Sequence, residues 1–232
     1  MISVVIPTYN HASSLVRCLN SVLAQRDVDL DVIIVDDGST DTTQEALFPY
    51  ANDAHVRMVR QDNRGSNNAR NAGARLARGA FLIFVDADAV LLPTMLCTLQ
   101  HALQQNTNSA YAYSDFRYSW KRFRAGAFSE TRLKTMNFIH TSALMRREAF
   151  EEFDESIRRF QDWDLWLTLL AHGNVGVYVP QMLFAISVER AGISSWLPKM
   201  SYHAPWRWFP GIRARVRSYE DAREVIRRKH HL

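Results

Sequence analysis

The stretch AFLIFVDADAVLLP, residues 80–93, decides the fold class because its run of large apolar side chains ends in two aspartates one residue apart. A continuous apolar run of this length is typical of a strand buried on both faces of a parallel sheet. Carboxylates are rarely buried without a partner. We therefore expect Asp86 and Asp88 to lie at the end of a buried strand and to bind a cation.

The first half of the chain alternates short apolar, β-branched segments with segments of helical periodicity. The predicted strands are residues 2–6, 31–35, 55–59, 81–85 and 110–114, and the predicted helices are 13–25, 41–48, 67–77 and 94–105. This alternation predicts an α/β fold with a central, mainly parallel sheet over about the first 115 residues.

The second half of the chain does not continue the regular alternation of strands and helices. The patterns predict a long loop over 116–137, amphipathic helices over 141–153 and 163–173, a strand over 174–180 that ends at Pro180, an irregular segment over 199–218 and a short charged helix over 219–229.

Composition and charge narrow the class of protein. The chain has 232 residues, 47% hydrophobic and 22% charged, which is ordinary for a soluble globular domain. We recognise neither a signal peptide nor a membrane-spanning segment. Cys18 and Cys97 lie in segments of helical pattern, as expected for buried thiols. Both observations favour a cytoplasmic location. The formal charge is +4, but residues 199–232 hold nine basic residues against three acidic ones, so this tail predicts contact with an anionic surface.

Polar and acidic segments follow three of the predicted strands. They are Pro7–Asn10, Asp36–Ser39 and Asp86–Asp88. Because parallel strands end at one edge of a sheet, where open α/β proteins bind ligands, these segments should converge there. Hard oxygen ligands suit Mg²⁺ or Mn²⁺ shared with a diphosphate. A purely local reading, in which DDGSTD is a turn and a helix cap, is also open.

The sequence resembles the inverting nucleotide-sugar glycosyltransferases of family two, which have the GT-A fold. The matching segments, in the order typical of that family, are VVIPTYN, CLNSVLAQ, VIIVDDGSTD, NRGSNNARNAGARLARGAFLIFVDAD, SALMRREAF and FDESIRRFQDWDLWL. They extend from residue 2 to about residue 170. Ala89, Gln161 and Thr168 depart from the residues that are usual there.

The resemblance implies a GT-A, Rossmann-like three-layer sandwich with a small acceptor-side region and a basic C-terminal tail. It places the nucleotide-sugar-binding half at residues 1–115, the acceptor-binding half at 116–198 and the basic aromatic tail at 199–232. It also implies that Trp163 and Asp164 lie beside the acceptor. With the strand-end placement, the expected donor-binding residues are Pro7, Thr8, Tyr9, Asp36, Asp37, Arg70 and Asp86, the metal ligands are Asp86 and Asp88, and the catalytic base is Asp162.

The chemistry expected of such a protein requires two separate carboxylate sites. A divalent cation, Mn²⁺ or Mg²⁺, stabilises the departing nucleoside diphosphate, while a second carboxylate takes the proton of the attacking hydroxyl. A UDP-sugar is the favoured donor, and a glycan or lipid-linked molecule the favoured acceptor, as in cell-envelope polysaccharide biosynthesis.

Two other functions are left open. A nucleotidyltransferase would normally carry a Gly-rich, basic loop after the first strand, which PTYNHASS lacks. A catalytically inactive relative could instead bind an anionic membrane at its inner face, or a partner, through the tail and its aromatic residues, Trp196, Trp206, Trp208 and Phe209. Nucleic acid is not an expected partner, because no recognisable module is present. His140 and His203 are expected to be packed or capping residues.

Overall fold

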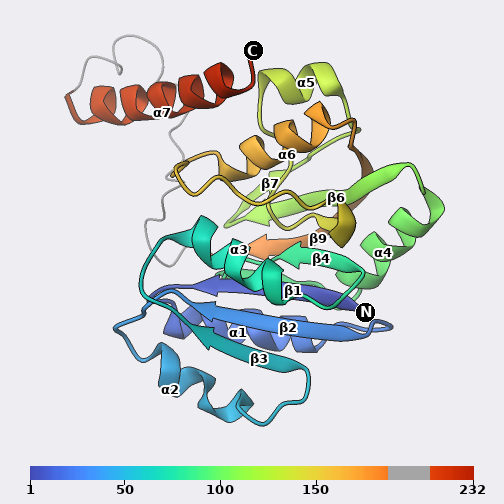
Figure 1. Cartoon of the computed structure of the whole chain (residues 1–232), viewed down its shortest axis with the longest axis vertical. Helices are drawn as coiled ribbons and strands as arrows, with labels where there is room; N and C mark the ends of the chain where they lie inside the picture. Colours follow the sequence, from blue (N-terminus) through green and yellow to red (C-terminus); the bar gives the residue numbers. More distant parts are fainter. Residues whose placement is uncertain (188–209) are drawn as a thin grey trace.

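The computed structural model, which describes residues 1–187 and 210–232, has the α/β architecture that the sequence predicts (Figure 1). Its strands are β1 (Ile2–Thr8), β2 (Leu30–Asp36), β3 (Val56–Arg60), β4 (Phe81–Phe84), β5 (Ala89–Leu91), β6 (Ser109–Tyr118), β7 (Lys121–Phe123), β8 (Leu144–Arg146) and β9 (Val175–Ile186). They form one nine-stranded sheet in the order β3-β2-β1-β4-β8-β6-β9-β5, with β7 paired to β6.

The sheet is mainly parallel. Strands β3, β2, β1 and β4 run in the same direction, and β6 runs with them because β8 is antiparallel to both β4 and β6. Strand β9 is parallel to β6, whereas β5 and β7 are antiparallel to their partners. The C-terminal ends of β1, β2, β3 and β4 therefore lie at one edge, which we call the strand-end edge (Figure 1).

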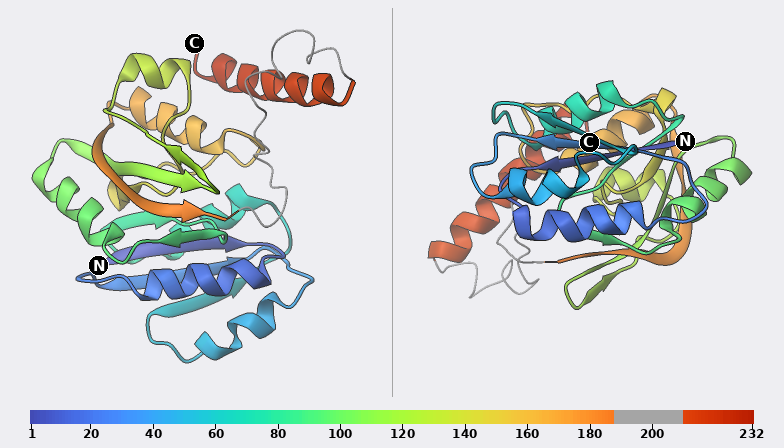
Figure 2. Two further views of the ribbon diagram at one scale, coloured as in Figure 1. Left: turned by 180° about the vertical axis from the view of Figure 1, so that it is seen from behind. Right: turned by 90° about the horizontal axis from the view of Figure 1, so that it is seen from below.

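Helices cover both faces of the sheet (Figure 2). One face carries α1 (Ala12–Leu23), α2 (Thr43–Leu47) and α4 (Met95–Gln105), and the other carries α3 (Ser66–Leu76), α5 (Glu130–Thr135) and α6 (Gln161–Ala171). Short 3₁₀ turns occupy Phe48–Tyr50 and Arg147–Ala149, and α7 (Pro210–Lys229) ends near α5 and α6. Among the described residues, no helix is both long and apolar enough to cross a bilayer.

The alternation of side chains along β1 divides the core into two layers. Val4 packs in the cluster beneath α1 and α4, and its neighbour Val5 packs in the cluster beneath α3 and α6. Helix α3 approaches the sheet closely because residue 73 is glycine: a Cβ there would lie 2.4 Å from Cγ1 of Val5 and 3.2 Å from Cγ2 of Val35. This close approach brings the side chains of α3 to the strand-end edge.

The helix predicted over residues 141–153 is wrong. Leu144–Arg146 forms β8, which fills the gap between β4 and β6, and a 3₁₀ turn follows it. The apolar spacing of this segment fits a helix, but pairing with two strands satisfies its backbone groups and overrides that local preference.

The strand predicted to end at Pro180 continues to Ile186. A proline usually ends a central strand because it lacks an N–H group. Here a bulge removes that difficulty, since Ser114 pairs with Val179 and Asp115 next pairs with Met182, which leaves Pro180 outside the ladder. The long loop predicted over 116–137 is likewise partly wrong, because it contains the end of β6, the β7 hairpin and α5.

The C-terminal helix begins nine residues earlier than predicted, at Pro210, a residue well suited to the first turn. Two ion pairs at i,i+4 spacing, Arg217–Asp221 and Arg228–Glu224, lie on it. Residues 188–209, which include Trp196, His203, Trp206, Trp208 and Phe209, lie outside the described residues.

Candidate functional site

Two loops at the strand-end edge are joined by Asn10, which follows β1. Its side-chain oxygen accepts a hydrogen bond from the Thr40 amide at 2.8 Å, and its own amide donates to the Ser39 hydroxyl at 2.9 Å. Asn10 has a positive φ of 57°, which asparagine tolerates better than most residues. The loops after β1 and β2 thus form one surface, as parallel strand order predicts.

Asp37 orders the next part of this surface. Its buried carboxylate accepts hydrogen bonds from the Gln61 side chain at 2.8 Å, the Arg64 amide at 2.9 Å and the Gly65 amide at 2.8 Å. Gly65 has a φ of 93°, a conformation that suits glycine, and the helix α3 begins directly after it. The carboxylate therefore fixes the path of the chain from β3 into α3.

The ends of β1 and β2 bury polar atoms that have no hydrogen-bond partner among the described residues. Thr8 Oγ1 and Asp36 Oδ2 are two of these atoms. Asp36 Oδ1 accepts from the Ser39 amide at 2.9 Å, and Oδ2 forms an ion pair with the Arg60 guanidinium at 3.4 Å but no hydrogen bond. Pro7 is buried beside them, whereas the Tyr9 ring is 45% exposed. Unsatisfied buried oxygens at a strand end are a reason to expect a polar ligand there.

An open pocket of about 500 Å³ adjoins Asp37 on the side of β3. It is lined by Arg60, Gln61, Asp62 and Arg64. Its size falls within the range of small-molecule sites. The Gln61 side chain lies between this pocket and the Asp37 carboxylate, to which it donates.

Arg70 and Asp86 form the central ion pair of the site. Arg70 projects from α3 and is buried, and its Nη2 donates to Asp86 Oδ1 at 2.8 Å. Burial by itself would raise the pKa of Asp86, but the positive charge of Arg70, helped by His140 and His11, holds it below its ordinary value. Asp86 is therefore an anion at neutral pH.

His140 lies between the two carboxylates expected to have different roles. Its Nδ1 accepts from the Ser142 amide at 3.1 Å, so the proton of the neutral ring is on Nε2, which lies 3.9 Å from Asp86 Oδ2. Burial lowers the pKa of His140, although Asp86 and Asp162 oppose that shift. The ring also packs against Phe116 and Phe184, with centroids 5.0 and 5.1 Å away, so the packed position expected from the sequence is present. No spacing pattern in the sequence could show the carboxylate-facing role.

Asp162, in the first turn of α6, completes the cluster. Its Oδ1 accepts from the Trp163 amide at 2.9 Å. Burial raises the pKa of Asp162, and His140, a hydrogen bond from Asn137 and the Trp163 amide only partly offset this effect. The two carboxylates that share His140 therefore have pKa values shifted in opposite directions.

Asp88 lies on the α1 side of the same strand end. Burial raises the pKa of the Cys18 thiol on α1, and the charges of Asp86 and Asp88 raise it further, which places both carboxylates near that thiol. Two carboxylate oxygens suit Mn²⁺ or Mg²⁺. Among residues 1–187 and 210–232, no group of three or more His, Cys, Asp or Glu side chains could hold a metal ion. A cation at Asp86 and Asp88 would take its remaining oxygen ligands from water or from a bound diphosphate.

Trp163 and Asp164, which were expected beside the acceptor, are both buried in the first turn of α6. Trp163 is buried and donates from Nε1 to the Leu133 carbonyl at 2.7 Å, and Asp164 is buried against the C-terminal helix. Their place beside the acceptor stays a prediction. The helix predicted over residues 163–173 is present as α6, and Trp166 on it is fully buried.

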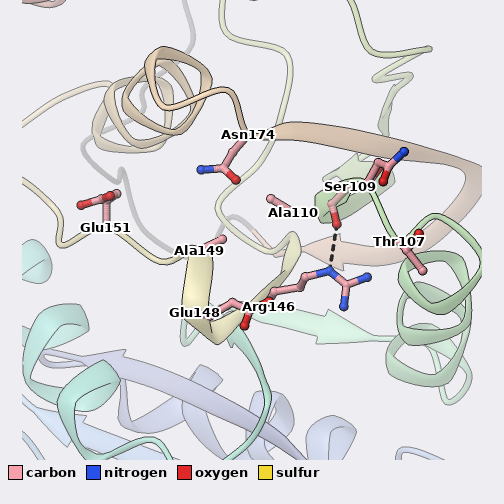
Figure 3. Close-up of a pocket in the computed structure, with 9 residues that line it drawn as sticks. Thr107, Ser109, Ala110, Arg146, Glu148, Ala149, Glu151 and Asn174 are labelled. Atoms are coloured by element: carbon pink, nitrogen blue, oxygen red, sulfur yellow. Dashed lines mark hydrogen bonds between the residues drawn. The ribbon is translucent and has the colours of Figure 1, made fainter.

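A second pocket, of about 290 Å³, lies at the opposite edge of the sheet, where β6 begins (Figure 3). Its Arg146 donates to the carbonyl groups of Ser109 at 3.0 Å and Leu103 at 2.8 Å. These bonds tie α4 to β6, so the guanidinium has a structural role, and the pocket is separate from the carboxylate cluster.

The sheet and its two helical layers define the chain as an α/β protein of the GT-A, Rossmann-like class. S. aureus TarS residues 1–349 in complex with UDP-GlcNAc superposes with a TM-score of 0.72 and 20% identity, covering 84% of this chain and 61% of that one. The mannosyltransferase PcManGT of Pyrobaculum calidifontis, in complex with GDP-Man and Mn²⁺, superposes with a TM-score of 0.63 and 21% identity, covering 89% and 59%.

Residues 3–154 match the model of the family "Glycosyl transferase family 2", and the chain belongs to this family. A chondroitin synthase of Escherichia coli is 32% identical over 185 residues, which are 73% of this chain and 26% of that protein. The chain therefore spans about a quarter of the length of this relative. The resemblance inferred from the six ordered motifs is confirmed.

Proposed function

We propose that the protein is an inverting glycosyltransferase that transfers a sugar from a nucleoside-diphosphate sugar, a UDP-sugar in the first instance, to a hydroxyl group of a glycan or lipid-linked acceptor. Family membership supports the reaction class, and the neighbouring structures that hold UDP-GlcNAc or GDP-Man with Mn²⁺ support the donor class. The observation that carries the proposal is the pair of carboxylates, Asp86 and Asp162, whose pKa values are shifted in opposite directions around His140.

The opposite shifts match the two roles that the reaction needs. A carboxylate that stays ionised suits the donor and its cation, and a carboxylate with a raised pKa suits proton transfer nearer to neutral pH. We assign Asp86 to the donor side and Asp162 to the base. The acceptor oxygen attacks the anomeric carbon as the bond to the diphosphate breaks, and Asp162 takes the hydroxyl proton, so attack from the face opposite the leaving group inverts the anomeric centre.

Asp88 and Asp86 would hold Mn²⁺ or Mg²⁺ together with the donor's diphosphate. Such a cation stabilises the negative charge of the departing nucleoside diphosphate. The chain itself contributes Arg70, which keeps Asp86 ionised and oriented, and the Nε2–H group of His140, which is directed toward the same carboxylate.

The remaining donor contacts fall to the strand-end loops. We place the nucleobase of the donor near Pro7, Tyr9 and the pocket lined by Arg60, Gln61, Asp62 and Arg64. In this proposal Thr8, Asp36 and Asp37 lie behind the nucleobase. Asp37 acts there by ordering the loop into α3, since three hydrogen bonds already occupy its carboxylate. Residues 1–115 form the donor half in this proposal, and 116–198 the acceptor half.

Two measurements test the proposal. A thermal-shift panel of UDP, GDP, CDP and dTDP with their sugars, each with and without Mn²⁺, identifies the nucleobase of the donor, because a ligand that binds the folded state raises its stability. The Asp162→Asn variant should then bind the same nucleotide sugar as the wild type, while its transfer rate falls by about 10²–10⁴-fold. Full transfer by this variant would remove Asp162 as the base.

Contact with an anionic membrane is a separate proposal for the tail. Helix α7 exposes Arg213, Arg215 and Arg217 in its first two turns, although Glu220, Asp221 and Glu224 follow them. A lipid-linked acceptor would make such contact useful, and the tail could equally serve an inactive relative as a binding module. Flotation with anionic liposomes at low and high salt tests it, and the absence of salt-sensitive binding would exclude this role.

A further inference from the structure

The first turn of α6 carries the proposed base but has a weak local start. Its N-cap residue is Phe160, which has left-handed backbone angles (φ 62°, ψ 31°) and makes no side-chain capping hydrogen bond. A phenylalanine in this conformation is strained and persists only where surrounding contacts impose it. The orientation of Asp162, two residues later, therefore depends on contacts from outside α6.

Those contacts come from the end of α7. Asp164, in the same turn as Asp162, is buried, and its two carboxylate oxygens lie 2.9 Å from Nζ of Lys229 and 2.7 Å from Nε2 of His230. Lys229 also reaches Asp154, at 2.8 Å from Oδ2. The burial of Ile226 fixes the end of α7 in place. A buried carboxylate is tolerated only when it is paired, so Asp164 ties the start of α6 to the chain's last residues.

A second set of contacts reaches the N-cap itself. The ring of Tyr219 packs edge-on against the ring of Phe160, with centroids 5.0 Å apart. Arg159 donates to the Ser218 hydroxyl at 3.3 Å, and Arg223 donates to the carbonyl of Thr135, the last residue of α5, at 2.9 Å. Helix α7 thus contacts both the strained N-cap of α6 and the end of the helix that packs beside it (Figure 1).

We propose that the end of α7 positions the first turn of α6, which carries Asp162. Lys229 and His230 are positioning residues that act on Asp162 through Asp164, and we call their contacts with Asp164 the clasp. This inference deepens the proposed function, because it takes Asp162 as the base. Without the clasp, Asp164 would be a buried anion without its partners, and the turn would open to hydrate it. Among residues 1–187 and 210–232, Lys229 and His230 form their side-chain contacts with Asp154 and Asp164, and none with β1, β2, β4 or α3, which build the donor side, so donor binding should be unaffected.

The test compares Lys229→Met and His230→Ala with the matched control Arg228→Met, whose side chain is 80% exposed and pairs with Glu224 on its own helix. Hydrogen exchange of the amides of residues 160–166 should accelerate by about tenfold in both test variants and stay as in the wild type in the control. The kcat should fall by about tenfold, while the dissociation constant of the donor nucleotide changes by less than about twofold, and Lys229→Arg should restore kcat.

Each outcome has a distinct meaning. Unchanged exchange in α6 of both test variants overturns the clasp, whether or not the protein transfers sugar. Equal losses of donor affinity and kcat would show a general structural role and overturn the positioning role. A wild-type chain that binds nucleotide sugar but transfers none, with faster α6 exchange in the variants, would refute the base assignment and leave the clasp. If Lys229→Met fails to fold, His230→Ala carries the test.

Discussion

Replacing Arg70 by methionine should reveal how far one guanidinium determines the ionisation of the donor-side carboxylate. Arg70 is 9% exposed and Asp86 is 31% exposed at their side chains, and their charged atoms are 2.8 Å apart. Removing one partner of a fully buried pair costs about 3–5 kcal/mol. Because the Asp86 carboxylate is partly hydrated, we expect a smaller loss, about 1–3 kcal/mol in the free energy of unfolding at pH 7.

The sign of the pH dependence follows from the cause of the pKa shift. In the wild type the pKa of Asp86 is lowered, so its stabilising contribution is present above the unfolded value of 3.8 and is lost as the pH falls through the folded value. In Arg70→Met, burial dominates and the folded pKa should rise above 3.8. The stability difference between variant and wild type should therefore shrink as the pH is lowered from 7 toward about 4.

Urea unfolding at several pH values measures this difference, and a cycle with Asp86→Asn isolates the pair. The control is Arg75→Met on the same helix, where the exposed pair with Glu152, 2.7 Å apart, should contribute less than about 1 kcal/mol. A loss in Arg70→Met no larger than in Arg75→Met, or one that does not diminish in acid, would refute the role given to Arg70.

Three further predictions concern the donor, the base and the sheet. Asp88→Ala should abolish the Mn²⁺-dependent part of the thermal shift given by the donor, and retention of that part would exclude Asp88 as a ligand. Because burial raises the pKa of Asp162, the acid limb of the pH profile of kcat should have its midpoint above 3.8. In His140→Ala, which removes a group that lowers the pKa of Asp162, this midpoint should move to higher pH. An unchanged midpoint would contradict the effect of His140 on Asp162. Gly73→Ala should lower the free energy of unfolding by about 1–3 kcal/mol, because its Cβ would overlap Val5, and a stability equal to the wild type in urea would contradict the close packing of α3.

Local sequence signals predicted the strands and helices of residues 1–115 well, because the structure of this part depends on local pattern. Segments such as Val4–Ile6 and Val32–Val35 are β-branched and buried on both faces, so their strand character is visible in the sequence, and the rule that parallel strands share an edge then places Asp37 and Asp86 at that edge. The prediction failed for residues 141–153, where β8 depends on pairing with two distant strands.

The contacts between distant parts of the chain at the site could not be predicted from local pattern either. Lys229 and Asp164 are 65 residues apart, and no periodicity links them. His140 is flagged by no motif, because its importance lies in the carboxylates on either side of it, which come from β4 and α6. Pro180 illustrates the converse error: its local effect was correctly recognised, but a bulge in the ladder accommodated it.

The opposite pKa shifts of Asp86 and Asp162 arise from one difference in their surroundings. Burial acts in the same direction on both, so it cannot separate them. The direct contact with Arg70 overrides burial at Asp86, whereas at Asp162 the charges of His140 and Arg70 act from a greater distance and burial prevails. Neutralising Arg70 should therefore bring the two pKa values together and weaken the division of roles, while neutralising His140 should move both in the same direction. The proposed division between an ionised donor-side carboxylate and a basic acceptor-side carboxylate thus rests on Arg70, which projects from α3 and is paired directly with Asp86.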